Sequence, residues 1–329
     1  MNRILVTGAA GFIGGSLLAR LVNSNVKVLG IDNYSNYYDS RIKLMHIKSE
    51  NLASNIERVD ISNYDNLKNI YSEFSPDTVV HLAAQGGVRV SQYEPEPYII
   101  TNQLGFLNLL KLNNEFSVNK LIYASSSSVY GNETSAPFQE DLISSPPKSL
   151  YAASKLVNEL MATYYPNLTK GIRIGLRFFT VYGPWGRPDM VVAKLIAAGL
   201  LKKEFSLTAN LELARDFTYI NDVIDTLEDL LTLNTSAFEQ STIFNVSAEN
   251  PRRLDELIAI LKNLKINVNI KKDITSKLDV NLTHGSTKKL REAGIRIPKT
   301  SLEEGLKYTL EWMSKPINKD VLKMIGEAL

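Results

Sequence analysis

A glycine-rich segment near the start of the chain restricts the fold more than any other feature. It reads Thr7-Gly8-Ala9-Ala10-Gly11-Phe12-Ile13-Gly14, follows a short apolar run and opens a helix-like segment. Gly8 permits a tight turn, Gly11 lets the backbone approach a pyrophosphate, and Gly14 lets the helix pack closely on the strand. The first helical turn then offers free N–H groups and a positive dipole to phosphates. This pattern predicts a dinucleotide site; a tight turn that binds nothing is the alternative.

An acidic residue at the right distance supports the dinucleotide site. Asp32 ends the second apolar run, about 20 residues after the glycines, where a carboxylate accepts hydrogen bonds from both ribose hydroxyls and repels a 2′-phosphate. NAD is therefore favoured over NADP. Asp60, at the end of the third run, is a candidate for the adenine edge, with a plain helix cap as the alternative. The predicted cofactor contacts are Gly8, Gly11, Phe12, Ile13, Gly14, Asp32, Asp60, Ile61, Leu82, Ala83, Ala84, Tyr151 and Lys155.

Short apolar runs alternate with helix-like segments through the first half of the chain. The predicted strands are Arg3–Thr7, Val26–Ile31, Ile56–Asp60, Thr78–Leu82, Leu121–Ala124 and Ile172–Phe178. Their apolar character is too continuous for half-exposed strands and is typical of a parallel sheet covered on both faces. The alternation predicts right-handed crossovers and an α/β fold with a doubly wound parallel Rossmann sheet.

The pattern changes after Phe179, where glycine and proline crowd residues 183–188. The elements predicted beyond this loop are helices at Val191–Lys202 and Asn221–Leu233, strands at Phe217–Ile220 and Ile243–Val246, and a strand near Val268–Ile270 among amphipathic helices. We predict a smaller, interleaved C-terminal α/β domain. Residues 1–179 and 217–247 would form the NAD-binding domain, and residues 180–216 and 248–329 the sugar-nucleotide-binding domain.

Composition argues against several functional classes. Lys and Arg number 37 and Asp and Glu 35, a net charge of +2, which argues against a nucleic-acid partner. The chain has no cysteine, so a disulfide framework and a thiol nucleophile are excluded, and a reducing cytoplasmic location is expected. Its three histidines are scattered, so no metal site is expected. No stretch approaches the roughly 20 apolar residues of a membrane span, so no membrane association is expected.

A Tyr and a Lys stand four residues apart in Tyr151-Ala-Ala-Ser-Lys155, on one face if the segment is helical. Free tyrosine has a pKa of about 10. A nearby ammonium and an oxidised nicotinamide both favour the phenolate, so the pKa of Tyr151 is expected to fall toward the working pH. This spacing alone is common in helices. It gains weight from the upstream glycines and from Ser126, whose hydroxyl can bridge the tyrosine and a substrate hydroxyl.

Four further segments carry a family resemblance. They are His81-Leu-Ala-Ala-Gln-Gly-Gly-Val-Arg89-Val-Ser91, Ser125-Ser-Ser-Ser-Val-Tyr-Gly131, Arg177-Phe-Phe-Thr-Val-Tyr-Gly-Pro-Trp-Gly-Arg-Pro-Asp-Met190 and Arg215-Asp-Phe-Thr-Tyr-Ile220. Across essentially its whole length the chain resembles the extended short-chain dehydrogenase/reductases, within the NAD-dependent epimerase/dehydratase family. It is most similar to the UDP-glucuronate 4-epimerase group, and the third segment is close to a signature of that group.

The resemblance implies a reaction and a set of residues. Tyr151 would be the base, Lys155 its partner and Ser126 the hydroxyl relay in C4 epimerisation of UDP-glucuronate to UDP-galacturonate through a 4-keto sugar. Thr180 and Arg187 would face the sugar carboxylate. The other expected substrate contacts are Ser126, Ser127 and Arg89, with Arg215 and Asp279 at the UDP moiety. A homodimer is also implied, through helices at about Ile99–Asn113 and Tyr151–Tyr165.

The residues themselves leave alternatives open. A hexuronate needs a cation, and a guanidinium holds a carboxylate in a fork, but Arg187 could be a surface residue and Arg215 part of an interdomain salt bridge. Trp185 is expected to pack within its loop. Ser127 and Ser128 stand where a 4,6-dehydratase would carry an acid pair. The remaining rivals are an epimerase of neutral or N-acetylated UDP-hexoses, a UDP-glucuronate decarboxylase and a nucleotide-sensing regulatory protein.

Overall fold

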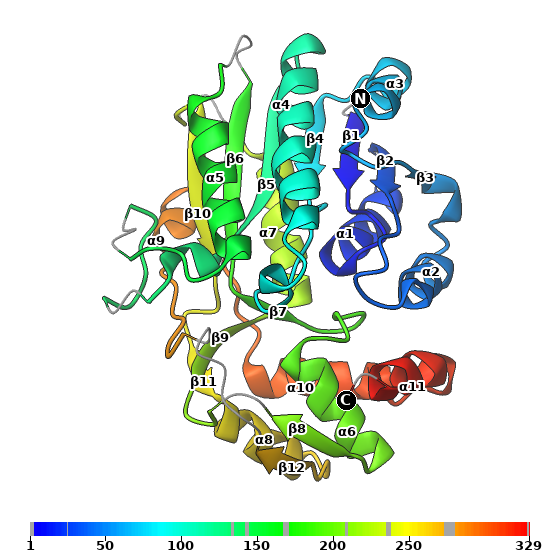
Figure 1. Ribbon diagram of the computed structural model, residues 1–329, viewed down its shortest axis with the longest axis vertical. Coiled ribbons are helices and arrows are strands. Elements are labelled where there is room, and N and C mark those ends of the chain that lie inside the picture. Colours follow the sequence, from blue (N-terminus) through cyan, green and yellow to red (C-terminus); the bar gives the residue numbers. More distant parts are fainter. Residues whose placement is uncertain are drawn as a thin grey trace.

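A computed structural model describes residues 3–24, 26–132, 135–141, 145–166, 171–207, 210–234, 238–272, 280–327 and 329. Within these residues seven strands form one sheet in the order β10-β6-β5-β4-β1-β2-β3, and every neighbouring pair is parallel (Figure 1). The strands are β1 (Arg3–Thr7), β2 (Lys27–Asp32), β3 (Ile56–Arg58), β4 (Thr78–His81), β5 (Lys120–Ser126), β6 (Ile172–Phe178) and β10 (Ser241–Val246).

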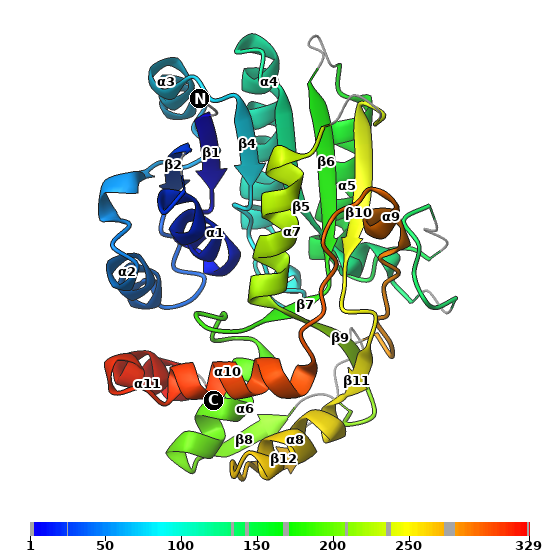
Figure 2. The same ribbon diagram turned by 180° about the vertical axis from the view of Figure 1, so that it is seen from behind.

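Helices cover both faces of this sheet. One face carries α3 (Tyr64–Phe74), α4 (Phe106–Glu115) and α5 (Leu150–Tyr164); the other carries α1 (Phe12–Val22) and α7 (Ile220–Thr232) (Figures 1 and 2). Successive β1 residues point to opposite faces: Leu5 packs with the core of α3 and α4, and Ile4 and Val6 pack with that of α1 and α7. Burial on both faces explains the continuous apolar runs, and the predicted doubly wound fold is confirmed.

A smaller part of the molecule lies beyond the carboxyl ends of the strands (Figure 1). It contains a sheet of β7 (Thr180–Tyr182), β9 (Ala214–Tyr219) and β11 (Pro251–Arg253), and a pair of β8 (Glu204–Leu207) and β12 (Asn269–Lys272). Its helices are α6 (Val191–Leu201), α8 (Leu254–Asn263), α10 (Leu302–Met313) and α11 (Lys319–Glu327). α2 (Ser40–Ser49), which follows β2, packs against both α1 and α11.

The predicted elements agree with the structure apart from their ends. β1 and β6 have the predicted bounds, and most other strands differ by one or two residues at an end. The predicted helix at Ile99–Asn113 begins instead as a π-helix over Tyr98–Gly105, which continues into α4. The division into two domains stays a prediction. Its boundary at residue 217 falls inside β9, which runs from Ala214 to Tyr219.

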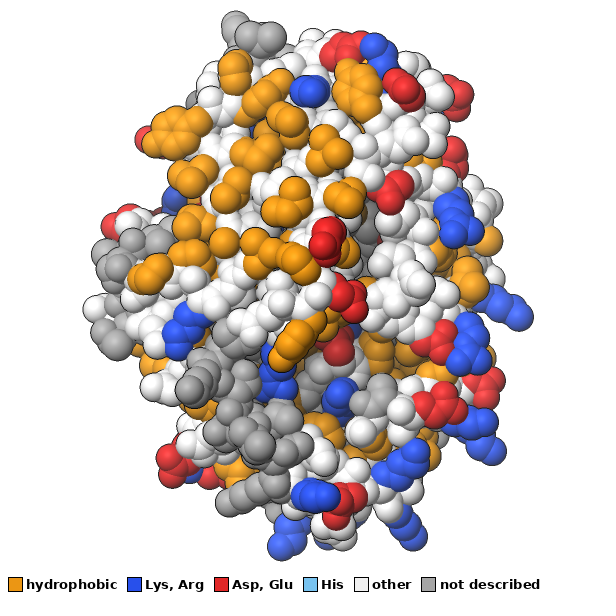
Figure 3. Space-filling model, in the orientation of Figure 1, with side chains coloured by type: hydrophobic (Ala, Val, Ile, Leu, Met, Phe, Trp, Pro, Cys, Tyr) orange, Lys and Arg blue, Asp and Glu red, His pale blue; other side chains and the backbone are white. Residues whose placement is uncertain are grey.

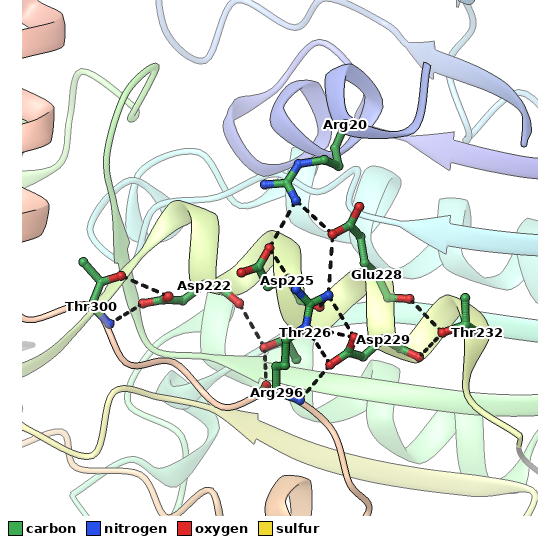
Figure 4. A network of polar contacts seen from close by, with 9 residues as sticks. All are labelled: Arg20, Asp222, Asp225, Thr226, Glu228, Asp229, Thr232, Arg296 and Thr300. Atoms are coloured by element: carbon green, nitrogen blue, oxygen red, sulfur yellow. Dashed lines mark hydrogen bonds and ion pairs between the residues drawn. The ribbon is translucent and has the colours of Figure 1, made fainter. Parts of the chain in front are cut away.

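A polar network fastens the segment between α9 (Lys288–Glu292) and α10 to α7 (Figure 4). Arg296 lies 2.8 Å from Asp229 of α7, and the Thr300 hydroxyl donates to Asp222 at 3.0 Å. Arg20 of α1 joins the other side of the network, 2.9 Å from Glu228. Exposed ion pairs stabilise a fold only modestly, so the network mainly fixes where the returning chain runs over the large sheet.

Two findings concern the described residues only. None of their helices combines the length and the apolar character that crossing a bilayer requires. None of their His, Asp and Glu side chains gather in a group that could hold a metal ion.

Candidate active site

The ends of four strands bring the predicted site residues to one edge of the large sheet. Thr7 ends β1, Asp32 ends β2, His81 ends β4 and Ser126 ends β5. These strands are neighbours in the order β5-β4-β1-β2 and run parallel, so their carboxyl ends share one edge. Open parallel sheets bind ligands at this edge. The glycine-rich turn and the catalytic candidates therefore face the same space.

The glycine-rich turn is packed so closely that side chains would not fit. Gly8 has a φ of 71°, and a Cβ there would lie 2.6 Å from the backbone nitrogen of Ala83, in the turn after β4. A Cβ on Gly14 would collide with the carbonyl oxygen of Gly8. No described side chain caps the start of α1 at Gly11, so its first N–H groups are available to an anion. The turn fits the pyrophosphate of a dinucleotide.

Asp32 is buried at the end of β2, and its carboxylate is fixed on two sides. It accepts hydrogen bonds from the N–H groups of Ala10 at 3.0 Å and Tyr34 at 2.7 Å. The ammonium of Lys43, on α2, lies 3.8 Å away and also sits over the ring of Tyr38. Burial lowers the pKa of Lys43, and the Asp32 charge opposes this. Sequence reasoning missed Lys43, because nothing in the sequence shows that α2 packs beside Asp32.

The predicted contacts after β4 and in the first turn of α1 surround the glycine-rich turn. The N–H groups of Leu82 and Ala83 donate to the carbonyl oxygen and the hydroxyl of Thr7, at 3.1 and 3.3 Å. Ala84 is exposed, Phe12 is buried and Ile13 is partly buried. Contact of these residues with a dinucleotide stays a prediction.

Asp60 and Ile61 lie farther along the same edge, after β3. The Asp60 carboxylate accepts from the Asn33 amide at 2.9 Å and from the Ser62 N–H at 2.8 Å. Asn63, rather than Asp60, caps α3, so the helix-cap alternative for Asp60 is wrong. Ile61 is buried against the π-helix, where a Cβ on Gly105 would lie 2.6 Å from its Cδ1. Contact of either residue with the adenine stays a prediction.

Helix α5 presents the catalytic candidates to the end of β5. Its first turn is capped by Ser149, whose hydroxyl accepts from the Ala152 N–H, and its last carbonyls accept from Arg173. Tyr151 is half-buried and hydrogen-bonded to Ser126. Lys155 is 2% exposed, and its ammonium donates to the carbonyl oxygen of Ala124 at 2.8 Å. The structure therefore brings Tyr151, Ser126 and Lys155 together at one point.

The protein's own groups raise the pKa of Tyr151 instead of lowering it. Burial raises it, while the hydrogen bond to Ser126 and the charge of Arg187 act in the opposite direction. Burial also lowers the pKa of Lys155 to about 8, against the charge of Glu159. The expected lowering at Tyr151 is thus not produced by this chain alone, because desolvating a phenolate costs more than these neighbours return.

His81 is buried behind these groups. Its Nδ1 lies 2.8 Å from the Thr7 hydroxyl, its ring stacks on Phe106, and its Nε2 has no hydrogen-bond partner among the described residues. Burial lowers its pKa to about 3, and the charge of Lys155 acts in the same direction. His81 is therefore neutral at working pH and adds no charge to the site.

Arg187 lies beside Tyr151 but already holds a carboxylate. Its Nε and Nη2 donate to the two oxygens of Asp189 at 2.9 and 2.6 Å. The Tyr37 ring lies against the guanidinium, 5.3 Å from its centre, and the Tyr37 hydroxyl donates to Asp189 at 3.0 Å. A Cβ on Gly86 would lie 2.5 Å from Nη1 of Arg187. Arg187 is thus built into the site rather than being a surface residue, and sequence reasoning missed both Asp189 and Tyr37.

Aromatic packing fixes the loop that carries Arg187. Trp185 is 8% exposed and has a φ of 61°, a conformation that bulky residues rarely adopt. Its ring stacks on His46 of α2 at 4.7 Å and meets Trp312 of α10 at 4.9 Å. Trp185 is thus a buried packing residue, as predicted, but its ring contacts are with α2 and α10 rather than within its own loop.

Four of the remaining predicted substrate residues lie on β7, on β9 and in the segments after β4 and β5. Ser127 is partly buried in the turn after Ser126. Thr180 begins β7, two residues after Phe178, the register partner of Ser126. Arg215 lies on β9 and donates to the carbonyl oxygen of Ala214. Arg89 is exposed on the loop after β4, and Asp279 lies outside the described residues.

The π-helix carries three polar residues that sequence reasoning did not find. Asn102 is fully buried, accepts from the Gln85 N–H at 2.8 Å and donates to the Ser154 hydroxyl at 3.0 Å. Gln103 donates to the Ser154 carbonyl, and the Tyr98 hydroxyl donates to the carbonyl of Gly87 at 2.6 Å. These bonds tie α5 to the loop after β4. π-Helices are frequent at functional sites, but no sequence pattern indicated this one.

Comparison with known proteins agrees with this geometry. A UDP-glucuronate 4-epimerase of Thermodesulfobacterium geofontis is 37% identical over 331 residues, covering 99% of each chain. The crystal structure of UDP-glucuronic acid 4-epimerase from Bacillus cereus, with UDP-glucuronic acid and NAD, has a TM-score of 0.87 at 31% identity, covering 94% of this chain and 98% of that one. The UDP-glucose 4-epimerase of Thermotoga maritima, with UDP-glucose, reaches 0.83 at 30% identity, with the same coverage. The model of the NAD-dependent epimerase/dehydratase family matches residues 4–247, and the chain belongs to that family.

Proposed function

We propose that this protein is an NAD-dependent UDP-glucuronate 4-epimerase. The observation that carries the proposal is the position of Arg187, a cation beside Tyr151 and its hydrogen-bonded Ser126. In a hexuronate the sugar carboxylate lies close to the reacting carbon. A guanidinium binds a carboxylate through two parallel hydrogen bonds. The solved B. cereus relative holds UDP-glucuronic acid and NAD together on the same fold.

The reaction follows from the placement of α5. Tyr151, directly or through Ser126, would take the proton of the sugar 4-hydroxyl and later return it to the 4-oxygen, after the 4-keto sugar has turned its other face toward the cofactor. Bound NAD would supply the hydride chemistry at C4, with the hydride leaving one face and returning to the other, and its positively charged ring would favour the Tyr151 phenolate. Gly8, Gly11 and Gly14 would hold its pyrophosphate and Asp32 its ribose. Lys155, fixed to the Ala124 carbonyl, would hold the second ribose and support the phenolate.

Arg187 would also protect the intermediate. The 4-keto uronic acid is a β-keto acid, and it loses CO₂ when the bond from C5 to the carboxylate aligns with the carbonyl π system. A clamp of Arg187 and Thr180 would hold the carboxylate away from that alignment. In enzymes, fixed contacts of this kind contribute roughly several kcal/mol to stabilising the reacting species. In this account, decarboxylation is what the site avoids rather than what it catalyses.

A second candidate is epimerisation of a neutral UDP-hexose. Asp189 already neutralises Arg187, so a neutral sugar could bind without leaving an unpaired cation, and the T. maritima relative holds UDP-glucose. The deciding experiment incubates the purified protein with UDP-glucuronate, UDP-glucose and UDP-N-acetylglucosamine and separates the products. The proposal expects UDP-galacturonate to form with the highest kcat/KM. Faster turnover of UDP-glucose would favour the second candidate.

The protein is expected to bind NAD at least tenfold more tightly than NADP. The Asp32 carboxylate would accept from the ribose hydroxyls of NAD, whereas a 2′-phosphate would meet its negative charge. Titration watched by tryptophan fluorescence measures both affinities, since Trp185 contacts α2 beside this site. Asp32→Asn removes the charge at nearly the same size and should narrow the difference. Equal affinities in the wild type would contradict the role of Asp32.

We also propose that two copies associate through the face of the π-helix, α4 and α5. Exposed apolar side chains gather there, as Figure 3 shows, including Ile99 at 51%, Leu104 at 44% and Leu160 at 49% exposure. Apolar patches of this kind on a stable fold mark interaction surfaces. A face of two neighbouring helices allows the same patch to meet itself across a two-fold axis. The lack of cysteine supports a cytoplasmic location for this assembly.

Leu160→Arg is expected to convert the dimer to a monomer, because a charge on this face would be buried against its symmetry mate. Sedimentation equilibrium measures the mass. Leu44→Arg is the matched control, since Leu44 is 54% exposed on α2, away from this face, and it should leave the mass unchanged. A wild-type protein of monomer mass, or a Leu160→Arg protein of dimer mass, would contradict the proposed interface.

A further inference from the structure

A buried charged residue, Glu159, continues the catalytic face of α5. Tyr151, Lys155 and Glu159 are spaced four residues apart, so they lie one above another along one side of the helix. Glu159 is 4% exposed, as buried as Lys155. A carboxylate is almost never buried to this extent unless it is paired. The proposed reaction assigns Glu159 no role.

Glu159 joins α5 to two strands of the large sheet. Its carboxylate accepts a hydrogen bond from the Ser125 hydroxyl at 2.5 Å and two from Arg177, from Nε at 2.9 Å and Nη2 at 2.8 Å. Ser125 and Arg177 are register partners on β5 and β6. The carboxylate thus holds α5 against both strands. On β5 it does so at Ser125, one residue before the catalytic candidate Ser126.

Arg177 is itself anchored from the far side. It is 1% exposed, its Nη1 donates to the Tyr130 hydroxyl at 2.8 Å and to the Glu140 carbonyl at 3.0 Å, and the Tyr130 ring lies 4.7 Å from its guanidinium. The Tyr130 hydroxyl in turn donates to Asn245 of β10. The Glu159 carboxylate therefore has little freedom to move relative to Lys155 and Ser126.

The surroundings of Lys155 contain one negative charge among the described groups that act on it. From α5 it is faced by Tyr151 and Glu159, from β4 by the neutral His81 and from β5 by the Ala124 carbonyl, with Arg177 of β6 beyond Glu159. Burial lowers the pKa of Lys155 to about 8, and Glu159 is the group that opposes this. Without that carboxylate, a buried lysine would tend to lose its proton near neutral pH.

We propose that Glu159 is a positioning residue for the epimerisation: one helical turn beyond Lys155, its carboxylate fixes the end of β5 at Ser125 and keeps the Lys155 side chain an ammonium. This inference rests on the proposed roles of Tyr151 and Lys155. A buried ion pair pays a large desolvation cost and is often no more stable than apolar packing. The Glu159–Arg177 pair is therefore not explained by the stability of the fold alone. Keeping Lys155 protonated would give the pair a function in the reaction.

The test compares Glu159→Gln, Glu159→Asp and Ser125→Ala by the pH dependence of kcat with UDP-glucuronate. Loss of the Lys155 proton should appear as a fall in kcat at high pH. Glu159→Gln removes a negative charge, which destabilises the ammonium, so this fall should move to lower pH by roughly one unit. Glu159→Asp keeps the charge but shortens the side chain, so it should lower kcat and leave the fall near its wild-type pH. Ser125→Ala should also leave that pH unchanged.

The alternative is that Glu159 acts in folding alone, and this alternative predicts a different order of impairment among the variants. In that case Glu159→Asp, which loses contact with Arg177, would be at least as impaired as Glu159→Gln, and neither would move the fall in kcat. That result would overturn the proposal. If Glu159→Gln does not fold because Arg177 is left unpaired, the double variant Glu159→Gln/Arg177→Met removes both charges of the pair. The fall in kcat should still move to lower pH, but by less than in Glu159→Gln, because the more distant Arg177 cation is removed as well.

Lys155→Arg separates this inference from the proposed function. An arginine stays protonated throughout the range, so whatever activity remains should show no fall at high pH. If the fall disappears in Lys155→Arg but stays in place in Glu159→Gln, only the role of Glu159 is overturned. If it persists in Lys155→Arg, the group that titrates is not Lys155, and both assignments are overturned.

Discussion

Tyr151→Phe should lower the rate of epimerisation by roughly 10²- to 10⁴-fold or more while leaving NAD bound, since this is the range that a positioned acid–base group supplies. The substitution removes the hydroxyl that is hydrogen-bonded to Ser126 and keeps the ring, which meets the Tyr98 ring edge-on at 6.3 Å. No packing is lost, so the loss of rate would report on proton transfer. Product chromatography measures the rate, and fluorescence measures the affinity for NAD.

Tyr98→Phe is the matched control for this prediction. It removes a hydroxyl close to the site whose bonds go to the Gly86 and Gly87 carbonyls rather than to the substrate. We expect a much smaller loss of rate, through a less firmly held loop. If Tyr151→Phe retained more than a few per cent of wild-type activity, roughly, or lost no more than Tyr98→Phe, another group would be the base.

The sequence predicted the large sheet well, because the cause of each strand is local. Ile4, Leu5 and Val6 are apolar in succession since both faces of β1 are covered, and the run stops at Gly8, where the turn needs a positive φ. The sequence likewise predicted that Tyr151 and Lys155 share one face of a helix, because four residues make about one helical turn. Features set by adjacent residues were therefore predicted with nearly correct bounds.

Features that depend on packing between distant segments were not predicted. Lys43 reaches Asp32 only because α2 folds back beside β2, and Tyr37 reaches Asp189 from 152 residues away. Trp185 adopts its unusual backbone because His46 and Trp312 hold its ring from two different parts of the chain. Glu159 could have been found by extending the four-residue spacing one step beyond Lys155, but its partner Arg177 lies on another strand.

The pairing of Arg187 with Asp189 affects how the proposed binding of a sugar carboxylate would take place. The Arg187 side chain is 27% exposed and its guanidinium is paired with Asp189, so the two charges balance before any sugar enters. A hexuronate adds a second carboxylate to the same cation. Because Nε and Nη2 are taken by Asp189, the sugar carboxylate must share the guanidinium or displace that partner. Asp189 is therefore expected to weaken the binding of a uronate and to have little effect on the binding of a neutral hexose.

Arg187→Ala should accordingly weaken UDP-glucuronate binding by more than tenfold and change the products. Truncating one partner of a desolvated charge pair costs about 2–5 kcal/mol; partial exposure places Arg187 at the lower end, and about 1.4 kcal/mol already makes a factor of ten. The remaining turnover should release CO₂ and form a pentose nucleotide, because the keto acid is no longer held out of alignment. Calorimetry measures binding, and chromatography separates the products.

Asp189→Asn supplies the opposite change on the same guanidinium. It removes the competing charge at nearly constant size, so UDP-glucuronate should bind at least as tightly as to wild type, while UDP-glucose should change little in either variant. Binding of UDP-glucuronate that is weakened equally by Arg187→Ala and Asp189→Asn would mean that the pair only supports the loop. If Arg187→Ala handles UDP-glucuronate as well as wild type does, the carboxylate is held elsewhere or is absent from the true substrate, and the neutral UDP-hexose becomes the better assignment.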